Sequence, residues 1–338
     1  MSTQVTIKDI ARALQISPST VSRALKDHPD ISKQTKKAVV ELANQLNYQP
    51  NYIALSLRKS KTNTIGVIIP QIVHFFFSTI ISGIEDIAYK SGYNVIISQS
   101  NESFDREVSD TKALLASRVD GFLVSMSKET NDLDHFGDLI NRGIPLVFFD
   151  RSCDELDVSQ VVIDDYQGAY EATKHLVDIG CKRIAHMQGP KNQTIFQERL
   201  RGYREAIEDS GMTYDESLVV HCYDGTMEEA MNHTHYLFDL PKPPDGIFSN
   251  NDLAAIAAMK IIKRRDLEIP KDVALVGFSD WQVSSLVDPS LSTVIQSGYE
   301  MGQKAAQLFL EQIENPDDYK PRKEVITPKL VIRESSTR

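Results

Sequence analysis

The strongest constraint on the fold is a series of short, almost purely apolar segments that alternate with amphipathic ones. Residues 65–70 read Ile-Gly-Val-Ile-Ile-Pro, and residues 145–149 read Pro-Leu-Val-Phe-Phe. Such runs are typical of strands that are buried on both faces of a parallel sheet. The segments between them carry apolar residues at helical spacing, as at Ile80, Ile84 and Ile87. The pattern therefore predicts an α/β fold with parallel sheets.

The apolar segments form two successive series, which predicts two similar lobes. The expected strands are residues 65–70, 93–98, 121–125, 144–150 and 161–164 in the first series, and 183–188, 217–221, 246–249 and 273–278 in the second. Two late segments, 293–296 and 325–332, would let the chain cross back between the lobes. We therefore expect a first lobe at about 63–162 and 293–325, and a second lobe at about 163–292 and 326–338.

The charge of the chain is unevenly distributed. Residues 1–62 contain ten Lys or Arg and four Asp or Glu, so this segment carries +6, while the whole chain carries −10 and the remainder therefore −16. A small basic region attached to an acidic body is the electrostatic signature of DNA binding at one end. Chance clustering of charge on a solvated surface is the alternative, and sequence detail has to decide between the two.

The basic region contains signals for three short helices. Thr6 and Asp9 have the spacing of a capping box, Ser17 and Pro18 suit the start of a second helix, and Ser32 suits the start of a third. The expected inner faces are formed by Ile7, Ile10, Ala11 and Leu14, by Val21, Ala24 and Leu25, and by Val39, Leu42, Ala43 and Leu46. The prediction is an all-α helix-turn-helix domain over residues 1–50.

In a helix-turn-helix module the second helix enters the major groove of DNA. We expect Arg23 to read a base directly, because a guanidinium can pair with both acceptors of guanine. Lys33, Lys36 and Lys37 are expected to hold phosphates. A helical interaction module without DNA is the alternative, although the exposed face carries hydroxyls and arginine and lacks apolar anchors.

Three ordered motifs over about fifty residues resemble the LacI/GalR repressor family. They are Thr6-Ile-Lys-Asp-Ile-Ala11, Ser17-Pro-Ser-Thr-Val-Ser-Arg-Ala-Leu25 and Leu46-Asn-Tyr-Gln-Pro-Asn51. The resemblance implies a homodimer that binds a pseudo-palindromic double-stranded operator. The DNA-binding candidates are Thr6, Ser17, Pro18, Ser19, Thr20, Arg23, Lys26, Lys33, Tyr48, Asn51, Leu57 and Arg58. Lys26 stands where Asn is common, which leaves the operator sequence open.

Residues 51–62 are expected to form a hinge between the head and the body. Residues 54–58 can form one or two helical turns, too few to be stable alone in water. The resemblance implies that this hinge helix pairs with its twin in the minor groove and that Leu57 wedges between base pairs. Leu55 departs from the family, where many members carry Arg. A flexible tether whose leucines pack on the body is the alternative.

The resemblance extends to the body, which the family builds like a two-lobed periplasmic binding protein. Polar residues follow the predicted strands, where ligands sit in open α/β sheets. The effector-binding candidates are Phe76, Phe77, Asp150, Arg151, Asp164, Arg199, Asn251, Asp252, Ser279 and Asp280. Ser279 stands where many members have Asp, and Asp280 is the expected substitute.

Each of these candidates also has a purely structural interpretation. Phe76 and Phe77 suit the core, and Arg199 suits a surface ion pair. Asp150 with Arg151 suits a structural salt bridge at the hinge between the two lobes, and Asn251 with Asp252 suits a helix cap.

Aromatic, amide and charged side chains together suit a polar, hydroxylated ligand, and we expect a sugar or sugar derivative. A carboxylate or phosphate on that ligand would favour Arg151 and Arg199. A sugar-binding receptor without a DNA role and a regulator controlled by a protein partner are the alternatives.

Other classes of protein find little support in the sequence. No phosphate-binding loop, no G-x-S-x-G nucleophile elbow and no HExxH pattern occurs in the sequence. We therefore expect no enzymatic activity and no cofactor. Three cysteines without a C-x-x-C pair predict neither a disulfide framework nor a metal site. No apolar run is long enough to span a membrane, and the polar N-terminus lacks a signal-peptide core, so we expect a cytoplasmic protein.

Overall fold

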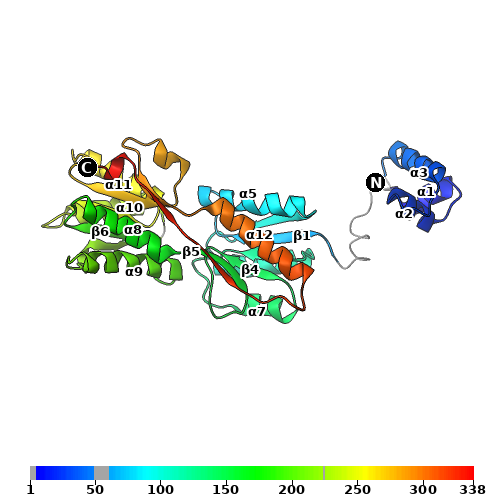
Figure 1. Ribbon diagram of the computed structural model, residues 1–338, viewed down its shortest axis with the longest axis horizontal. Coiled ribbons are helices and arrows are strands. Elements are labelled where there is room, and N and C mark those ends of the chain that lie inside the picture. The colour runs from blue at the N-terminus through cyan, green and yellow to red at the C-terminus, as the bar shows by residue number, and fades with distance from the viewer. Residues whose placement is uncertain (1–4, 49–60, 224) are drawn as a thin grey trace. The chain divides into compact units, whose positions relative to one another are not determined.

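The computed structural model describes residues 5–48, 61–223 and 225–338, and the chain divides into two compact units, Met1–Thr62 and Asn63–Arg338. Figure 1 shows the first unit as a small helical head and the second as two α/β lobes. The predicted hinge helix at 54–58 lies outside the described residues, as do the DNA-binding candidates Asn51, Leu57 and Arg58.

The head contains the three predicted helices: α1 (Ile7–Ala13), α2 (Pro18–Leu25) and α3 (Lys33–Gln45). Ile10, Val21 and Val39 form its fully buried centre, one from each helix. The backbone N–H of Thr20 donates to Ser17 Oγ at 3.0 Å, so Ser17 caps α2 as predicted. Leu46 was expected on the inner face of the third helix. It is instead 38% exposed, because α3 ends there.

The first lobe is built on a six-stranded parallel sheet. Its strands, in spatial order, are β11 (Lys323–Ile326), β5 (Ser159–Ile163), β4 (Leu146–Phe149), β3 (Gly121–Val124), β1 (Thr64–Ile69) and β2 (Asn94–Gln99). Its helices are α5 (Phe75–Lys90), α6 (Phe104–Ala116), α7 (Asp134–Asn141) and α12 (Gly298–Glu314). Four of the six strands are buried at almost every position, as the apolar runs predicted.

The second lobe repeats this plan with one difference. Its strands, in spatial order, are β12 (Lys329–Val331), β10 (Ser292–Ile295), β9 (Ala274–Phe278), β8 (Gly246–Ser249), β6 (Ile184–Gln188) and β7 (Val219–His221). The edge strand β12 is antiparallel to β10, and the other pairs are parallel. Its helices are α8 (Asp165–Asp178), α9 (Thr194–Asp209), α10 (Met227–Phe238) and α11 (Asp252–Arg264), with three short 3₁₀ helices η1 (Glu216–Leu218), η2 (Gln282–Ser285) and η3 (Glu334–Ser336).

The chain passes between the lobes after β5, after β10 and between β11 and β12. Figure 1 shows the last of these passages as the red segment that runs from one lobe to the other. The expected return at residue 293 is too early, because β10 pairs with β9 of the second sheet. The single late strand expected at 325–332 is two strands, one in each sheet. Pro328, which lies between them, has no N–H to donate to a ladder.

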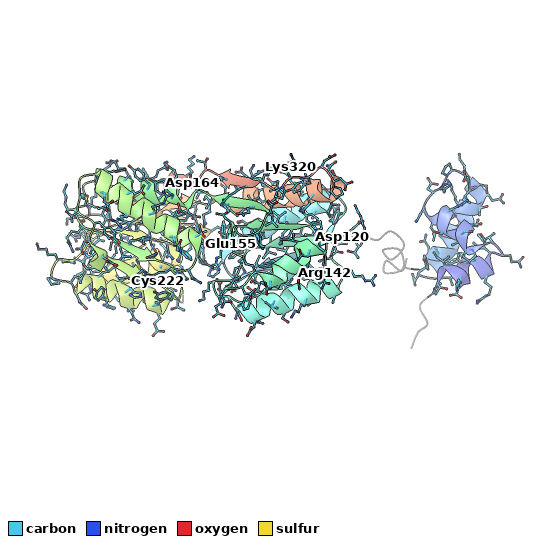
Figure 2. The ribbon with its side chains drawn as sticks, turned by 90° about the horizontal axis from the view of Figure 1, so that it is seen from below. Asp120, Arg142, Glu155, Asp164, Cys222 and Lys320 are labelled. Carbon is cyan, nitrogen blue, oxygen red and sulfur yellow. The ribbon has the colours of Figure 1, made fainter. Side chains whose placement is uncertain are left out.

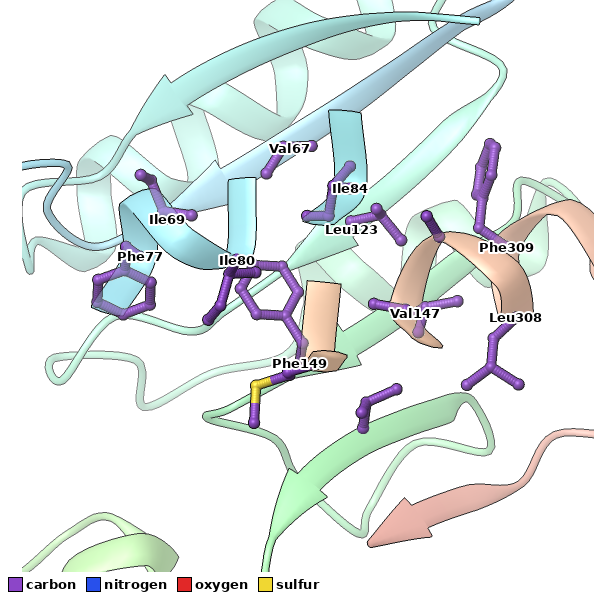
Figure 3. Close-up of a cluster of buried hydrophobic side chains, with 14 of the residues drawn as sticks. Val67, Ile69, Phe77, Ile80, Ile84, Leu123, Val147, Phe149, Leu308 and Phe309 are labelled. Atoms are coloured by element: carbon purple, nitrogen blue, oxygen red, sulfur yellow. The ribbon is translucent and has the colours of Figure 1, made fainter. Parts of the chain in front are cut away.

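Helix α12 anchors the late part of the chain to the first lobe. A Cβ atom at Gly83 of α5 would lie 2.1 Å from the Tyr299 carbonyl oxygen, and one at Gly302 of α12 would lie 2.0 Å from the Ile80 carbonyl oxygen. Only glycine allows the two helix backbones this approach. Figure 3 shows the apolar core beneath them, with α5, α12 and the strands β1, β3 and β4 contributing side chains. This core fixes the strand ends from which the site is built.

Among the described residues, we find no helix that combines the length and the apolar character needed to cross a membrane.

Candidate functional site

A cavity of about 280 Å³ lies between the two lobes, where strands of both sheets end. The first lobe contributes residues that follow β1, β2, β3 and β4. The second lobe contributes residues that follow β6, β7, β8, β9 and β10. This is the position at which open α/β sheets bind ligands. Of the predicted effector-binding residues, those that line this cavity are Phe76, Phe77, Asp150, Arg151, Arg199, Asn251 and Ser279.

Phe76 and Phe77 have both of the roles that the sequence allowed. They are 8% and 3% exposed and belong to the core of the first lobe, where Figure 3 shows Phe77 beside Ile80. Both also line the cavity. Their rings therefore give the cavity a rigid apolar wall, which suits the apolar face of a ligand.

Arg199 is held in place from three directions. Its Nε donates to Asp165 Oδ1 at 2.7 Å, and its Nη1 donates to the Asn250 carbonyl oxygen at 2.6 Å. Its guanidinium carbon lies 3.8 Å from the centre of the Phe278 ring, which adds a cation–π contact. Arg199 is only 4% exposed. The ion pair foreseen for this residue is therefore present, and it is buried at the cleft.

Asp165 begins α8 and carries the charge that matches Arg199. Burial raises the pKa of Asp165 to about 6, although the Arg199 guanidinium acts to lower it. The ionised state of this carboxyl therefore depends on its arginine partner.

Arg151 is paired in the same way in the first lobe. Its Nη1 donates to Glu102 Oε2 at 2.7 Å, and its Nε lies 3.9 Å from Asp150 Oδ2. Burial acts to raise the pKa of Glu102, but the Arg151 guanidinium holds it below its ordinary value. Burial raises the pKa of Asp150, which is 5% exposed. Both arginines of the cavity thus have their charge matched by a carboxylate.

Asn251 and Ser279 each have a structural partner at the edge of the cavity. Asn251 Oδ1 accepts the Ala254 N–H at 2.8 Å and so caps α11, as the alternative interpretation predicted. Ser279 donates its hydroxyl to Gln296 Oε1 at 2.6 Å. Asn251 Nδ2 donates one N–H to Asn250 Oδ1 at 3.0 Å, so one amide N–H is left for a ligand in the cavity that Asn251 lines.

Three predicted effector residues do not line this cavity. Asp252 is fully buried and accepts hydrogen bonds from the Trp281 N–H, the Ser284 hydroxyl and the Thr293 hydroxyl at 2.7, 2.7 and 2.5 Å. Asp280 pairs with Arg333 at 2.7 Å. Its carboxylate is therefore paired with Arg333 and does not take the place of the family's aspartate in this cavity, as had been expected.

Asp164, the third of these residues, caps α8 by accepting the Gln167 N–H at 2.9 Å. It lines a different cavity. All three aspartates were predicted to bind effector because each follows a predicted strand. Their hydrogen bonds and ion pairs with neighbouring residues explain why they do not line this cavity.

The contacts that join the lobes across the cavity were not predicted from the sequence. Lys128 Nζ donates to the Tyr223 carbonyl oxygen at 3.2 Å, and Asn192 Nδ2 donates to the Lys128 carbonyl oxygen at 2.6 Å. The rings of His74 and Trp281, one from each lobe, lie 5.7 Å apart. The only signal for these residues in the sequence is that they follow a predicted strand.

The predicted DNA-binding residues of the head are mostly exposed. Exposed are Thr6, Ser17, Pro18, Ser19, Arg23, Lys26 and Lys33, whereas Thr20 and Tyr48 are half-buried. Thr6 donates its hydroxyl and its backbone N–H to Asp9 at the start of α1, at 2.6 and 3.0 Å. Lys36, expected on phosphate, instead lies 2.6 Å from the Asp27 carboxylate. The exposed face of α2 therefore carries hydroxyls and a guanidinium over a small apolar core.

A helix-turn-helix head joined to a two-lobed body with a polar cavity defines a transcription regulator that binds DNA and an effector. Comparison with known proteins agrees with this class. A family model for bacterial regulatory proteins of the lacI family matches residues 6–51. A model for periplasmic binding proteins and the sugar-binding domain of the LacI family matches residues 62–334. The chain belongs to the LacI family.

Curated relatives match over almost their whole length. The ribose operon repressor of Halalkalibacterium halodurans is 34% identical, with 98% of this chain and 97% of the relative covered. Catabolite control protein A of Priestia megaterium is 32% identical, with 90% and 91% covered.

Solved structures have the same architecture. The transcriptional regulator CelR in complex with cellobiose is 28% identical, with a TM-score of 0.75 and coverage of 98% of this chain and 100% of that one. The Lac repressor dimer bound to operator and an anti-inducer reaches a TM-score of 0.89 at 24% identity, with 99% and 100% covered, and this likeness concerns the fold.

Proposed function

We propose that this chain is a transcription repressor that binds a pseudo-palindromic operator as a homodimer and is controlled by a neutral sugar or sugar derivative in the interlobe cavity. Residues 1–50 would be the DNA-binding domain, 51–62 the hinge, and 63–338 the effector-binding and dimerisation domain. The observation that carries the proposal is the cavity itself, because both lobes build it and a ligand there contacts both.

On the DNA side, the proposal rests on the exposed face of α2. Ser17 and Ser19 are exposed at the N-terminal end of this helix, the part that meets base edges in helix-turn-helix proteins, and Arg23 is exposed in its last turn. Arg23 has the chemistry for bidentate contact with guanine. Thr6, Lys26 and Lys33 are exposed around it and would position the phosphate backbone.

On the ligand side, the pairing of the two cavity arginines with carboxylates favours a neutral molecule. Glu102 lies 2.7 Å from Arg151, and Asp165 lies 2.7 Å from Arg199, so neither guanidinium has unmatched charge for a phosphate or carboxylate. Hydroxyl groups can still share the remaining donors and acceptors, and the ring of Phe76 supplies an apolar face. Relatives support this class, since CelR is described with cellobiose and an Enterococcus faecium regulator with ribose.

The proposed dimer is supported by apolar side chains left exposed on the first lobe. The edge strand β2 has Ile96 and Ile97 at 42% and 40% exposure, and Tyr89 at the end of α5 is 83% exposed. A long edge strand with exposed isoleucines is a liability in a monomer. A second copy of the chain would cover it, and the Lac repressor is described as a dimer on its operator.

The proposed control is a shift between two arrangements of the lobes. A ligand that contacts both lobes favours the arrangement it fits better, by the difference in its affinity for the two. That shift changes how the paired heads fit two half-sites of DNA. We propose that the body binds its ligand without chemical turnover. We also propose that the protein acts in the cytoplasm, because regulators of this family act on DNA.

A thermal-shift screen of the full chain tests the ligand class. Neutral sugars, sugar phosphates, sugar acids and purines would be compared at equal concentration. A ligand at 100 times its dissociation constant adds roughly 2.7 kcal/mol to the free energy of unfolding. We expect stabilisation by a neutral sugar that disappears in Arg199→Ala. Stabilisation by sugar phosphates or sugar acids alone would contradict the charge argument.

A further inference from the structure

The two lobes are hydrogen-bonded to each other at Lys128, beside the cavity. Lys128 follows β3 in the first lobe and lines the cavity. Its Nζ donates to the Tyr223 carbonyl oxygen at 3.2 Å, and its own carbonyl oxygen accepts a hydrogen bond from Asn192 Nδ2 at 2.6 Å. Tyr223 follows β7 and Asn192 precedes α9, so the two partners come from different segments of the second lobe. One residue of the first lobe thus binds two segments of the second.

The chain around Lys128 is fixed to the first lobe by a buried carboxylate. Glu107 of α6 is fully buried. Its Oε2 accepts the Ser127 N–H at 2.6 Å, and its Oε1 accepts the Thr130 hydroxyl at 2.8 Å. Burying a carboxylate is costly unless it is hydrogen-bonded, and these two bonds go to residues on either side of Lys128. The first lobe therefore presents Lys128 in a defined position.

The second lobe fixes the acceptor of Lys128 in a similar way. Glu229 of α10 accepts the Tyr223 N–H at 2.7 Å and the Gly225 N–H at 3.0 Å. These bonds hold Tyr223, whose carbonyl oxygen accepts the hydrogen bond from Lys128. Tyr223 and Gly225 also line the cavity. Donor and acceptor are each held within their own lobe, so the bond between them forms only when the lobes lie close together.

A shared carboxylate connects Lys128 to the interior of the cavity. Glu102 Oε2 accepts both the Lys128 backbone N–H at 2.8 Å and Arg151 Nη1 at 2.7 Å. Glu102 and Arg151 both line the cavity. A ligand that bonds to either side chain therefore acts on the oxygen atom that also holds the backbone of Lys128.

A pair of aromatic rings offers a way to observe closure of the lobes. The rings of His74 and Trp281, one from each lobe, lie 5.7 Å apart, and both residues line the cavity. Trp281 is half-buried, and it is the only tryptophan in the chain. Separation of the lobes would part the two rings and expose the indole to solvent. The intrinsic fluorescence of the chain therefore reports on closure at the cavity.

We propose that Lys128 is a positioning residue that holds the two lobes together over the cavity and so slows the release of the ligand. Its two hydrogen bonds stabilise the closed arrangement of the lobes, and a ligand that contacts both lobes stabilises the same arrangement. This role rests on the proposed function, because it takes the interlobe cavity as the effector site. It also implies that Lys128 favours closure in the ligand-free chain.

The first test is acrylamide quenching of Trp281 fluorescence in the ligand-free full chain. Lys128→Met removes the Nζ donor, and Asn192→Ala removes the other hydrogen bond at a residue that does not line this cavity. We expect a larger quenching constant in both variants, because the lobes separate more often. The matched control Lys320→Met removes the same charge from an exposed position of the first lobe, which Figure 2 shows away from the junction with the second. Its quenching constant should equal that of the original chain.

The second test is stopped-flow fluorescence with D-ribose and with cellobiose, the sugars described with two solved relatives. Dissociation should be about fivefold faster in Lys128→Met and in Asn192→Ala, as for one hydrogen bond between partly exposed groups, with association within about a factor of two. Lys128→Arg keeps a donor and should restore slow release. The free energy of unfolding should be unchanged in all of these variants.

Unchanged quenching in both Lys128→Met and Asn192→Ala would overturn the role of Lys128. An equal effect in Lys320→Met, or a change confined to the association rate, would overturn it as well. The quenching test uses no sugar and therefore decides the role of Lys128 by itself. Failure of the original chain to bind any neutral sugar would instead contradict the proposed function.

Discussion

The two arginines that we propose for recognition, one in the head and one in the body, lie in opposite environments. Arg23 lies on an exposed helix face, and its side chain makes no hydrogen bond or ion pair in the part of the chain that the structure describes. Arg199 is 4% exposed and has a carboxylate, a carbonyl oxygen and an aromatic ring as partners. We therefore expect recognition in the head to be separate from the stability of the fold, and recognition in the body to share its residues with the packing of the second lobe.

The largest expected effect is that of Arg199→Ala. It leaves the Asp165 carboxyl buried without its partner, which costs about 3–5 kcal/mol of the free energy of unfolding. Chemical denaturation of the full chain measures this loss, and ligand binding should disappear as well. Replacing both residues, as Arg199→Met with Asp165→Leu, should restore much of the stability without restoring ligand binding. If the single variant lost ligand binding at unchanged stability, the contrast between head and body would not hold.

Arg23→Ala should have the reverse profile. We expect a change in the free energy of unfolding of less than about 0.5 kcal/mol, because the side chain is exposed. Operator affinity should fall by about 1–3 kcal/mol, with relaxed preference at one base position, as measured on duplexes selected from a random pool. Lys90→Ala, at the exposed end of α5, is a matched control for the loss of one positive charge. Equal weakening on all sequences would reassign Arg23 to a phosphate contact.

Glu102→Gln tests the network in the first lobe. The Glu102 carboxylate accepts both the Arg151 guanidinium at 2.7 Å and the Lys128 backbone N–H at 2.8 Å. The substitution keeps the shape but removes the charge, so sugar affinity should fall by about 1–2 kcal/mol. The variant should also begin to bind sugar phosphates, because Arg151 then has unmatched charge. Continued exclusion of phosphates would show that the charge of Arg151 does not determine ligand class.

The last prediction concerns the dependence of stability on pH. The pKa of Asp165 is about 6 in the folded chain and near its ordinary value of 3.8 when unfolded. Between these values the folded state binds more protons, so the contribution of this group to the free energy of unfolding falls as pH rises from about 4 to 6 and is constant above. Denaturation profiles of the original chain and Asp165→Asn should therefore differ in slope in that window. Parallel profiles from pH 4 to 6 would contradict the raised pKa.

The sequence predicted the elements whose causes are local. Ser17 and Pro18 mark the start of α2 because capping depends on neighbouring residues, and the apolar runs mark β1 and β4 because both faces are buried. The sequence also indicated that polar residues gather after the strands. It could not show that Arg151 lines the cavity whereas the Asp252 carboxylate accepts three hydrogen bonds within the second lobe.

Contacts between the lobes could not be predicted from the sequence at all. The hydrogen bond from Lys128 to the Tyr223 carbonyl oxygen joins residues that are 95 positions apart. It depends on how close the two lobes lie, which no periodicity records. The division of residues 325–332 into two strands has the same origin, because each half completes the edge of a different sheet.

The central claim is that a ligand between the lobes controls the hold of the head on DNA. The most direct test is fluorescence anisotropy of the full chain on its selected operator, titrated with the sugar that stabilises it. We expect operator affinity to change by about 5- to 150-fold, the usual range of allosteric coupling, and Arg199→Met/Asp165→Leu to bind the operator without responding to the sugar. Unchanged operator affinity at saturating sugar would contradict the account, whatever the thermal shift shows.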